Sequence, residues 1–141
     1  MEPPPSRRLP LLALPSSTFV AGRTPRPADG WCDHVDRAQW FDYGCDLFDA
    51  GFYFEAHELW EQCWRAARDV DNADDARFLQ GLIKLAAAGV KWLAQAPAPM
   101  SSHLRGAEAL LSAGPARRGI SEHAWRQALR ALQRGQAPRL R

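Results

Sequence analysis

The fold is decided by LFDAGFYFEAHELWEQCW, residues 47–64, which predicts the end of one helix, a turn and a second helix. Gly51 marks the turn, because glycine readily takes the positive φ that ends many helices. At 100° per residue, His57, Glu61 and Trp64 fall in one narrow sector of the second helix. A purely structural helix would carry apolar residues there, since a buried carboxylate is costly unless it is paired or hydrogen-bonded. This sector is therefore the candidate functional site.

Helical periodicity continues on both sides of this stretch, and glycines, prolines and short polar loops separate the periodic segments. No segment reads as a strand. We therefore expect an all-α fold, a compact bundle of about five helices with short antiparallel connections. The predicted helices span residues 36–50, 53–68, 75–95, 101–113 and 121–134.

Several residues should set the geometry of the third predicted helix. Asp74 is the expected N-cap, and Pro97 and Pro99 are expected to end the helix. Gly89 lies in its apolar face, where glycine costs about 1 kcal/mol of helix propensity relative to alanine. We expect another helix to approach closely at Gly89.

Proline content divides the chain. Residues 1–35 contain seven of the 11 prolines and are predicted to form an extended or partly disordered arm. The helical domain is expected at 36–135, and a basic C-terminal tail at 136–141. The apolar residues that could tether the arm to the body are Phe19, Val20 and Trp31.

Charge is unevenly distributed, although the net charge is only +2. Residues 29–75 carry a net charge of −10 and residues 76–141 a net charge of +9. Acidic and basic helices could attract each other within one fold, or a basic C-terminal face could bind an acidic partner. Arg126, Arg130 and Arg134 form a row on the last helix, but no nucleic-acid-binding module accompanies them. We therefore do not expect a nucleic-acid partner.

A second row contains Asp42, Asp46 and Asp49, at i, i+4 and i+7 of the first helix. Such a row could recruit a cation. We predict instead that it forms a solvated face, which is the more common role of such residues.

The three cysteines are widely spaced and contain no C-x-x-C, so neither a disulfide framework nor a zinc signature is present. Cys45 and Cys63 are expected to be small core residues. No apolar run approaches the roughly 20 residues that span a bilayer, so no membrane association is expected. We predict a reducing, cytoplasmic location.

The leading functional hypothesis is a pocket that binds a small ligand or a protein partner. His57 and Glu61 would be its polar anchors, and Tyr53, Trp60 and Trp64 its walls.

The main alternative is a metal-dependent or general acid/base enzyme of hydrolase type. His57-Glu58-x-x-Glu61 is similar to the zinc-protease motif H-E-x-x-H, with Glu61 in place of the second histidine. A divalent metal would then be the cofactor, and His103 is the nearest further ligand by helix face. Glu58 falls on the polar side of the second helix, near Arg65. We predict that it is a surface residue or an ion-pair partner, and the alternative is a catalytic role.

A second alternative is a structural or oligomerising module in which His57 and Glu61 form a buried, hydrogen-bonded pair. A homo-oligomer is compatible with each of these hypotheses. The sequence leaves open whether the protein is an enzyme.

Three motifs resemble the family called domain of unknown function, family 309. They are DLFxxGxYxEAHExWExxW at residues 46–64, FLQGLIKLAA at 78–87 and RGAxxLL at 105–111. The resemblance implies a compact helical bundle, and the family has no established activity to transfer. It also adds Gln80 and Lys84 as candidate ligand-binding residues, although the helical wheel places both on the polar face of the third helix.

Overall fold

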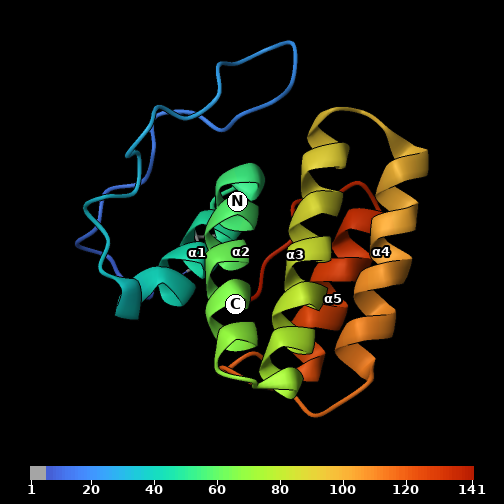
Figure 1. Cartoon of the computed structure of the whole chain (residues 1–141). Helices are drawn as coiled ribbons and strands as arrows, with labels where there is room; N and C mark the ends of the chain where they lie inside the picture. The colour runs from blue at the N-terminus through green and yellow to red at the C-terminus, as the bar shows by residue number, and fades with distance from the viewer. Residues whose placement is uncertain (1–5) are drawn as a thin grey trace.

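The computed structural model describes residues 6–141, which form five α-helices (Figure 1). No strand occurs among these residues, so the predicted all-α fold is confirmed. A short 3₁₀ turn, η1, precedes the first helix. The elements are η1 (Arg37–Gln39), α1 (Trp40–Asp49), α2 (Tyr53–Asp69), α3 (Ala73–Leu93), α4 (Pro97–Ser112) and α5 (Glu122–Gln133).

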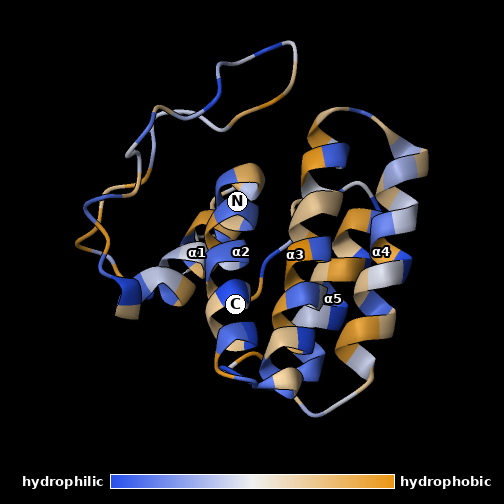
Figure 2. Cartoon of the chain, in the orientation of Figure 1, coloured by the Kyte–Doolittle hydropathy of each residue, from blue (hydrophilic) through white to orange (hydrophobic). Residues whose placement is uncertain are grey.

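The helix α3 is central to the bundle, because it packs extensively against both α2 and α4 (Figure 1). α1 packs against α2, and α5 lies against α4 and α3. Every helix carries both apolar and polar residues, as expected of amphipathic helices that share one core (Figure 2). The largest fully buried side chains are Trp60, Trp125, Tyr43, Tyr53, Phe48 and Phe78.

The starts of α3 and α4 differ from the predicted ones in which residues cap and open them. α3 begins at Ala73, and its N-cap is Asn72, whose side chain accepts a hydrogen bond from the Asp75 amide at 3.2 Å. Asp74 therefore lies inside the first turn. α4 begins at Pro97, although the sequence predicts this proline only as an end of the preceding helix. Proline suits the first helical turn, because amides there have no partner within the helix.

The predicted close approach at Gly89 is confirmed. A Cβ atom there would lie 2.6 Å from Cγ of the Tyr53 ring, so only glycine lets α2 pack this closely on α3. Gly44 has the same role in α1, where a Cβ atom would collide with the Trp60 indole. Both contacts offset the helix-propensity cost of glycine.

Asp46 corrects the prediction of a solvated acidic face on α1. Its side chain is buried and accepts hydrogen bonds from the backbone amides of Arg8 (2.7 Å) and Leu9 (2.9 Å). Asp42 remains 45% exposed and pairs with the Arg8 guanidinium at 2.8 Å. The prediction for Asp46 was wrong because its partners come from a segment more than 30 residues earlier in the chain.

Glu55 makes a similar contact at the start of α2. It is buried, and it accepts hydrogen bonds from the Thr18 hydroxyl (2.6 Å) and the Phe19 amide (2.9 Å). The Phe19 ring also packs edge-on against Phe54, with 4.7 Å between ring centroids. Residues 6–36 thus contact the bundle through two buried carboxylates and also through the Ala13 carbonyl, which accepts from the Tyr43 hydroxyl. Apolar residues of the same segment pack against the core as well: Leu9, Leu12, Leu14, Trp31 and Val35.

The last residues also contact the bundle, where the sequence predicts only a basic tail. Leu140 is buried, and its amide donates to Oδ1 of Asp49 at 2.7 Å. Burial raises the pKa of Asp49 to about 6. The hydrogen bond from the Leu140 amide and the positive charges of Arg8 and Arg141 work against this rise, whereas the negative charge of Asp46 adds to it.

This raised pKa gives a testable pH dependence. Between pH 4 and pH 6 the folded protein holds a proton on Asp49 that the unfolded chain has released, so this group's stabilisation is lost as pH rises through about 6. Replacing Asp49 with Asn, which can still accept the hydrogen bond from the Leu140 amide, should remove this loss of stability with rising pH. Because water screens part of the carboxylate, we expect a gain of about 1–2 kcal/mol at pH 7 and no gain near pH 4.

Denaturant unfolding from pH 4 to pH 7 measures this difference. Asp42→Asn, which removes an exposed carboxylate from the same helix, is the control and should keep the wild-type pH dependence. An Asp49→Asn curve parallel to wild type would contradict the prediction.

The acidic and basic parts of the chain attract each other at Asp75, at the start of α3. Arg118 donates to both Asp75 oxygens, at 2.8 and 2.7 Å, and Arg117 lies 3.5 Å from Oδ1. These hydrogen bonds, Arg118 first, hold the pKa of the Asp75 carboxyl below its ordinary value. Attraction within one fold therefore accounts for part of the charge asymmetry, while an acidic partner remains a prediction.

The cysteines are free thiols, and Cys45 and Cys63 are buried core residues as predicted. Burial raises the pKa of Cys63 to about 11, which keeps the thiol protonated and unreactive at neutral pH. Within residues 6–141, none of the helices combines the length and the apolar character that crossing a membrane requires.

Candidate functional site

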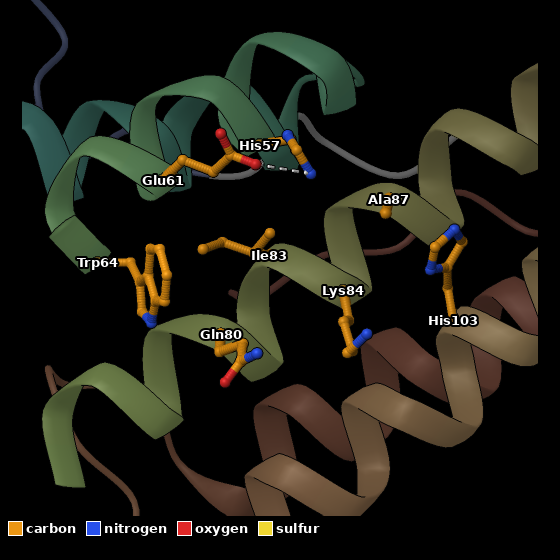
Figure 3. A pocket seen from close by; sticks show the side chains of 8 residues that line it. All are labelled: His57, Glu61, Trp64, Gln80, Ile83, Lys84, Ala87 and His103. Atoms are coloured by element: carbon orange, nitrogen blue, oxygen red, sulfur yellow. Dashed lines mark ion pairs between the residues drawn. The ribbon is translucent and has the colours of Figure 1, made fainter. Parts of the chain in front are cut away.

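Three side chains of α2 face α3, as the helical wheel predicts. His57, Glu61 and Trp64 stand at i, i+4 and i+7 and share the edge of α2 that opens toward α3 and α4 (Figure 3). All three are partly exposed. The second helix therefore presents an imidazole, a carboxylate and an indole along one line.

α3 and α4 complete a pocket with a volume of about 230 Å³. α3 contributes Gln80, Ile83, Lys84 and Ala87, which share one face by their spacing of 3, 4 and 7 residues, and α4 contributes His103. Figure 3 shows Trp64 at one end of the pocket and His103 at the other, with Ile83 and Lys84 between them. Residues from three helices are thus brought together around one small cavity.

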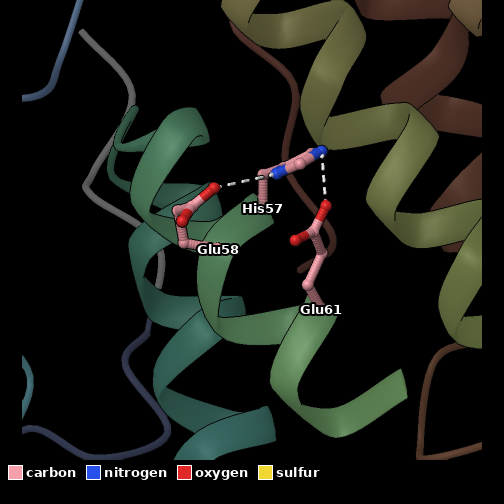
Figure 4. A group of neighbouring side chains, drawn as sticks. All are labelled: His57, Glu58 and Glu61. Carbon is pink, nitrogen blue, oxygen red and sulfur yellow. Dashed lines mark ion pairs between the residues drawn. The ribbon is translucent and has the colours of Figure 1, made fainter. Parts of the chain in front are cut away.

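The His57 imidazole lies between two carboxylates (Figure 4). Its Nε2 is 3.5 Å from Oε1 of Glu61, and its Nδ1 is 3.6 Å from Oε1 of Glu58. Both distances exceed those of good hydrogen bonds, and Nδ1 is buried without a hydrogen-bond partner. The ring therefore keeps hydrogen-bonding capacity that the described residues leave unused.

Glu58 is an ion-pair partner of His57 and does not pair with Arg65. Arg65 instead pairs with Glu61, one turn away, with Nη2 3.7 Å from Oε2. Residues 58 and 65 are two turns apart, whereas i, i+4 neighbours are adjacent on a helix surface. Glu58 is partly exposed and pairs with His57 from outside the pocket.

The His57–Glu61 pair is not sealed in the core. The two side chains are 23% and 32% exposed, and both line the pocket. The prediction that the pair is buried is therefore wrong, while a structural or oligomerising role stays a prediction.

Tyr53 and Trp60 are core residues, which corrects their prediction as pocket walls. Both are essentially unexposed, and neither lines the pocket. Trp60 donates from Nε1 to the Phe41 carbonyl at 3.3 Å, and burial followed by the Asp49 charge raises the pKa of Tyr53. Trp64 is the one predicted aromatic wall that lines the pocket.

His103 lies across the pocket from His57, on α4 (Figure 3). Burial, and then the positive charges of Lys84, Lys91 and His57, hold its pKa below the ordinary value. It is not part of the cluster of potential metal ligands, which contains His57, Glu58 and Glu61 with ligand atoms within 4.8 Å of one another. The structure therefore separates His103 from the other two predicted metal ligands.

Two pocket residues, Ile83 and Ala87, were not predicted as site residues. Their spacing from Gln80 and Lys84 is the signal that could have found them, because all four share one side of α3.

One comparison with known proteins finds a match to a protein family. Residues 41–102 match the family model described as Domain of unknown function (DUF309). Searches of curated proteins and of solved structures returned no match. The matched region contains every pocket residue except His103. The resemblance predicted from the motifs is thereby confirmed over residues 41–102, which match a domain whose function is unknown.

Proposed function

We propose that the pocket between α2, α3 and α4 binds a small ligand, with His57 and Glu61 as polar anchors and Trp64 as an apolar wall. One observation carries the proposal: side chains from three helices converge on a pocket of about 230 Å³ and leave polar groups facing it. An apolar cavity with a few convergent polar groups is typical of ligand sites. A protein partner would reach the same groups only by inserting a single side chain, so the pocket size favours a small molecule.

A divalent cation is the second candidate, since His57, Glu58 and Glu61 place one nitrogen and two oxygens within 4.8 Å of one another. Ligand atoms around a tetrahedral Zn²⁺ lie about 3.4 Å apart, because each stands about 2.1 Å from the ion. The three side chains would therefore have to draw closer together. The two carboxylates also lie at opposite edges of the imidazole ring, which favours the organic ligand (Figure 4).

Three single variants distinguish the two candidates: His57→Ala, Glu61→Gln and Glu58→Gln. A ligand at about 100 times its Kd stabilises the folded state by about 2.7 kcal/mol, which a thermal-shift screen of small organic molecules and divalent cations detects. For an organic ligand in the pocket, His57→Ala and Glu61→Gln should abolish this stabilisation, while Glu58→Gln should keep it. For a cation, all three variants should lose it.

Without ligand, each variant should unfold within a few degrees of wild type, because all three side chains are partly exposed. A loss of several kcal/mol in ligand-free His57→Ala or Glu61→Gln would contradict a binding role. It would favour a structural role for the pair.

A further inference from the structure

Lys84 is a cation without a counter-ion in the pocket. Within residues 6–141, no hydrogen bond or ion pair engages its ammonium group, and the same holds for the side chains of Gln80 and His103. Lys84 is nevertheless partly buried and lines the pocket. Because no carboxylate of the described residues neutralises this ammonium, a negative group bound beside it would gain a charge-assisted hydrogen bond.

The position of Lys84 depends on Gly106 of α4. A Cβ atom at Gly106 would lie 2.8 Å from Cδ of Lys84 and 3.6 Å from its Nζ. The absence of a side chain at Gly106 thus lets the aliphatic part of Lys84 lie along α4, with the ammonium at the pocket.

The charges around the pocket favour an anion at its α3–α4 side. His103 lies close enough to Lys84, Lys91 and His57 for their positive charges to lower its pKa, in addition to the effect of burial. Glu61 is the one carboxylate among the lining residues, and its two oxygens face His57 and Arg65 from the α2 side. The ammonium of Lys84 is therefore available to a ligand.

The rest of the pocket limits the size and character of that ligand. Trp64, Ile83 and Ala87 supply apolar surface beside the polar groups. A cavity of about 150 Å³ accommodates a benzene ring, so about 230 Å³ suits a molecule somewhat larger than benzene.

We propose that the pocket binds a small organic anion, with its carboxylate or phosphate group held by Lys84 beside Gln80 and His103 and its apolar part against Trp64 and Ile83. This inference rests on the proposed function and names the class of ligand. A carboxylate and a phosphate share the required chemistry, because both accept charge-assisted hydrogen bonds from an ammonium.

The test compares benzoate with benzamide, a neutral molecule of nearly the same shape, and with phenyl phosphate. Amide chemical shifts of Lys84, Ala87 and His103 report binding by NMR titration. Benzoate or phenyl phosphate should bind about tenfold more tightly than benzamide, and added salt should weaken binding of the anions only. The stronger of the two anions distinguishes a carboxylate ligand from a phosphate ligand.

Lys84→Met should remove most of the tenfold preference, because it keeps the aliphatic chain and deletes the charge. Lys91→Met is the matched comparison: it makes the same change on α3 at a residue that does not line the pocket but whose charge acts on His103, so it should reduce the preference less than Lys84→Met. Equal binding of benzoate, phenyl phosphate and benzamide, unchanged by Lys84→Met, would overturn the anion inference and leave the small-ligand proposal standing. If millimolar concentrations of all three probes leave the pocket amides unshifted, both proposals are overturned.

Discussion

Replacing Trp60 with alanine should lower the free energy of unfolding by about 3–5 kcal/mol. The indole is fully buried between Phe41 and Phe48, whose ring centroids lie 6.3 and 5.7 Å away. Its removal would leave a cavity where α1 crosses α2 and would also leave the Phe41 carbonyl without the hydrogen bond from Nε1. Urea unfolding, followed by circular dichroism, measures the change.

Trp64→Ala is the matched control, because it removes the same side chain one helical turn away. Trp64 is partly exposed and lines the pocket, so its loss should cost about 1 kcal/mol and should weaken ligand binding. Equal destabilisation by the two substitutions would show that the structure has assigned the two tryptophans wrongly to core and pocket.

These two tryptophans also show where reasoning from the sequence stops. Periodicity predicts α2 almost residue for residue and places His57, Glu61 and Trp64 on one face, because the helical repeat is a local property. A wheel gives the angle of a side chain but not the neighbour it meets. Trp60 faces α1 and Trp64 faces the opening toward α3, and this difference depends on contacts between helices.

Gln80 and Lys84 illustrate the same limit for residues of the polar face. The wheel places them on the polar face of α3, apart from the apolar stripe. The pocket lies at the border of that face, where the polar edge of α3 meets α2 and α4. Only the packing of three helices brings Lys84 into the same pocket as His57. The sequence therefore indicates both residues as candidates but cannot show that they lie in one pocket.

The burial of Asp46 contradicts its prediction, and that of Glu55 is not indicated by the sequence, for a related reason. Carboxylates on an amphipathic helix are mostly solvated, and nothing local indicates that amides of residues 8, 9 and 19 will bind them. A buried carboxylate that accepts two backbone or hydroxyl hydrogen bonds needs no neighbour in its own helix. The proline-rich segment supplies such donors, because its amides are not used in helices or strands.

Replacing Asp46 with alanine should therefore release the segment that contains Arg8 and Leu9 and lower the free energy of unfolding by about 2–4 kcal/mol. The estimate reflects the loss of two hydrogen bonds to a charged acceptor and of the nearby Arg7 guanidinium, whose Nε is 3.5 Å from Oδ2. Hydrogen exchange at the Arg8 and Leu9 amides should accelerate at least 30-fold, corresponding to about 2 kcal/mol of local opening. Trypsin should also cleave sooner after Arg7 and Arg8.

Asp42→Ala separates this anchoring from the general loss of a negative charge on α1. Asp42 also pairs with Arg8, but it contacts the guanidinium of Arg8 and is itself exposed. Removing the Asp42 carboxylate should therefore lower the free energy of unfolding by less than about 1 kcal/mol. Asp46→Asn, which keeps one acceptor oxygen, should fall between the two. Unchanged exchange at Arg8 and Leu9 in Asp46→Ala would mean that the segment is held by its apolar contacts alone. The expected order, Asp46→Ala above Asp46→Asn above Asp42→Ala, follows from the number of backbone amides that each variant leaves without an acceptor.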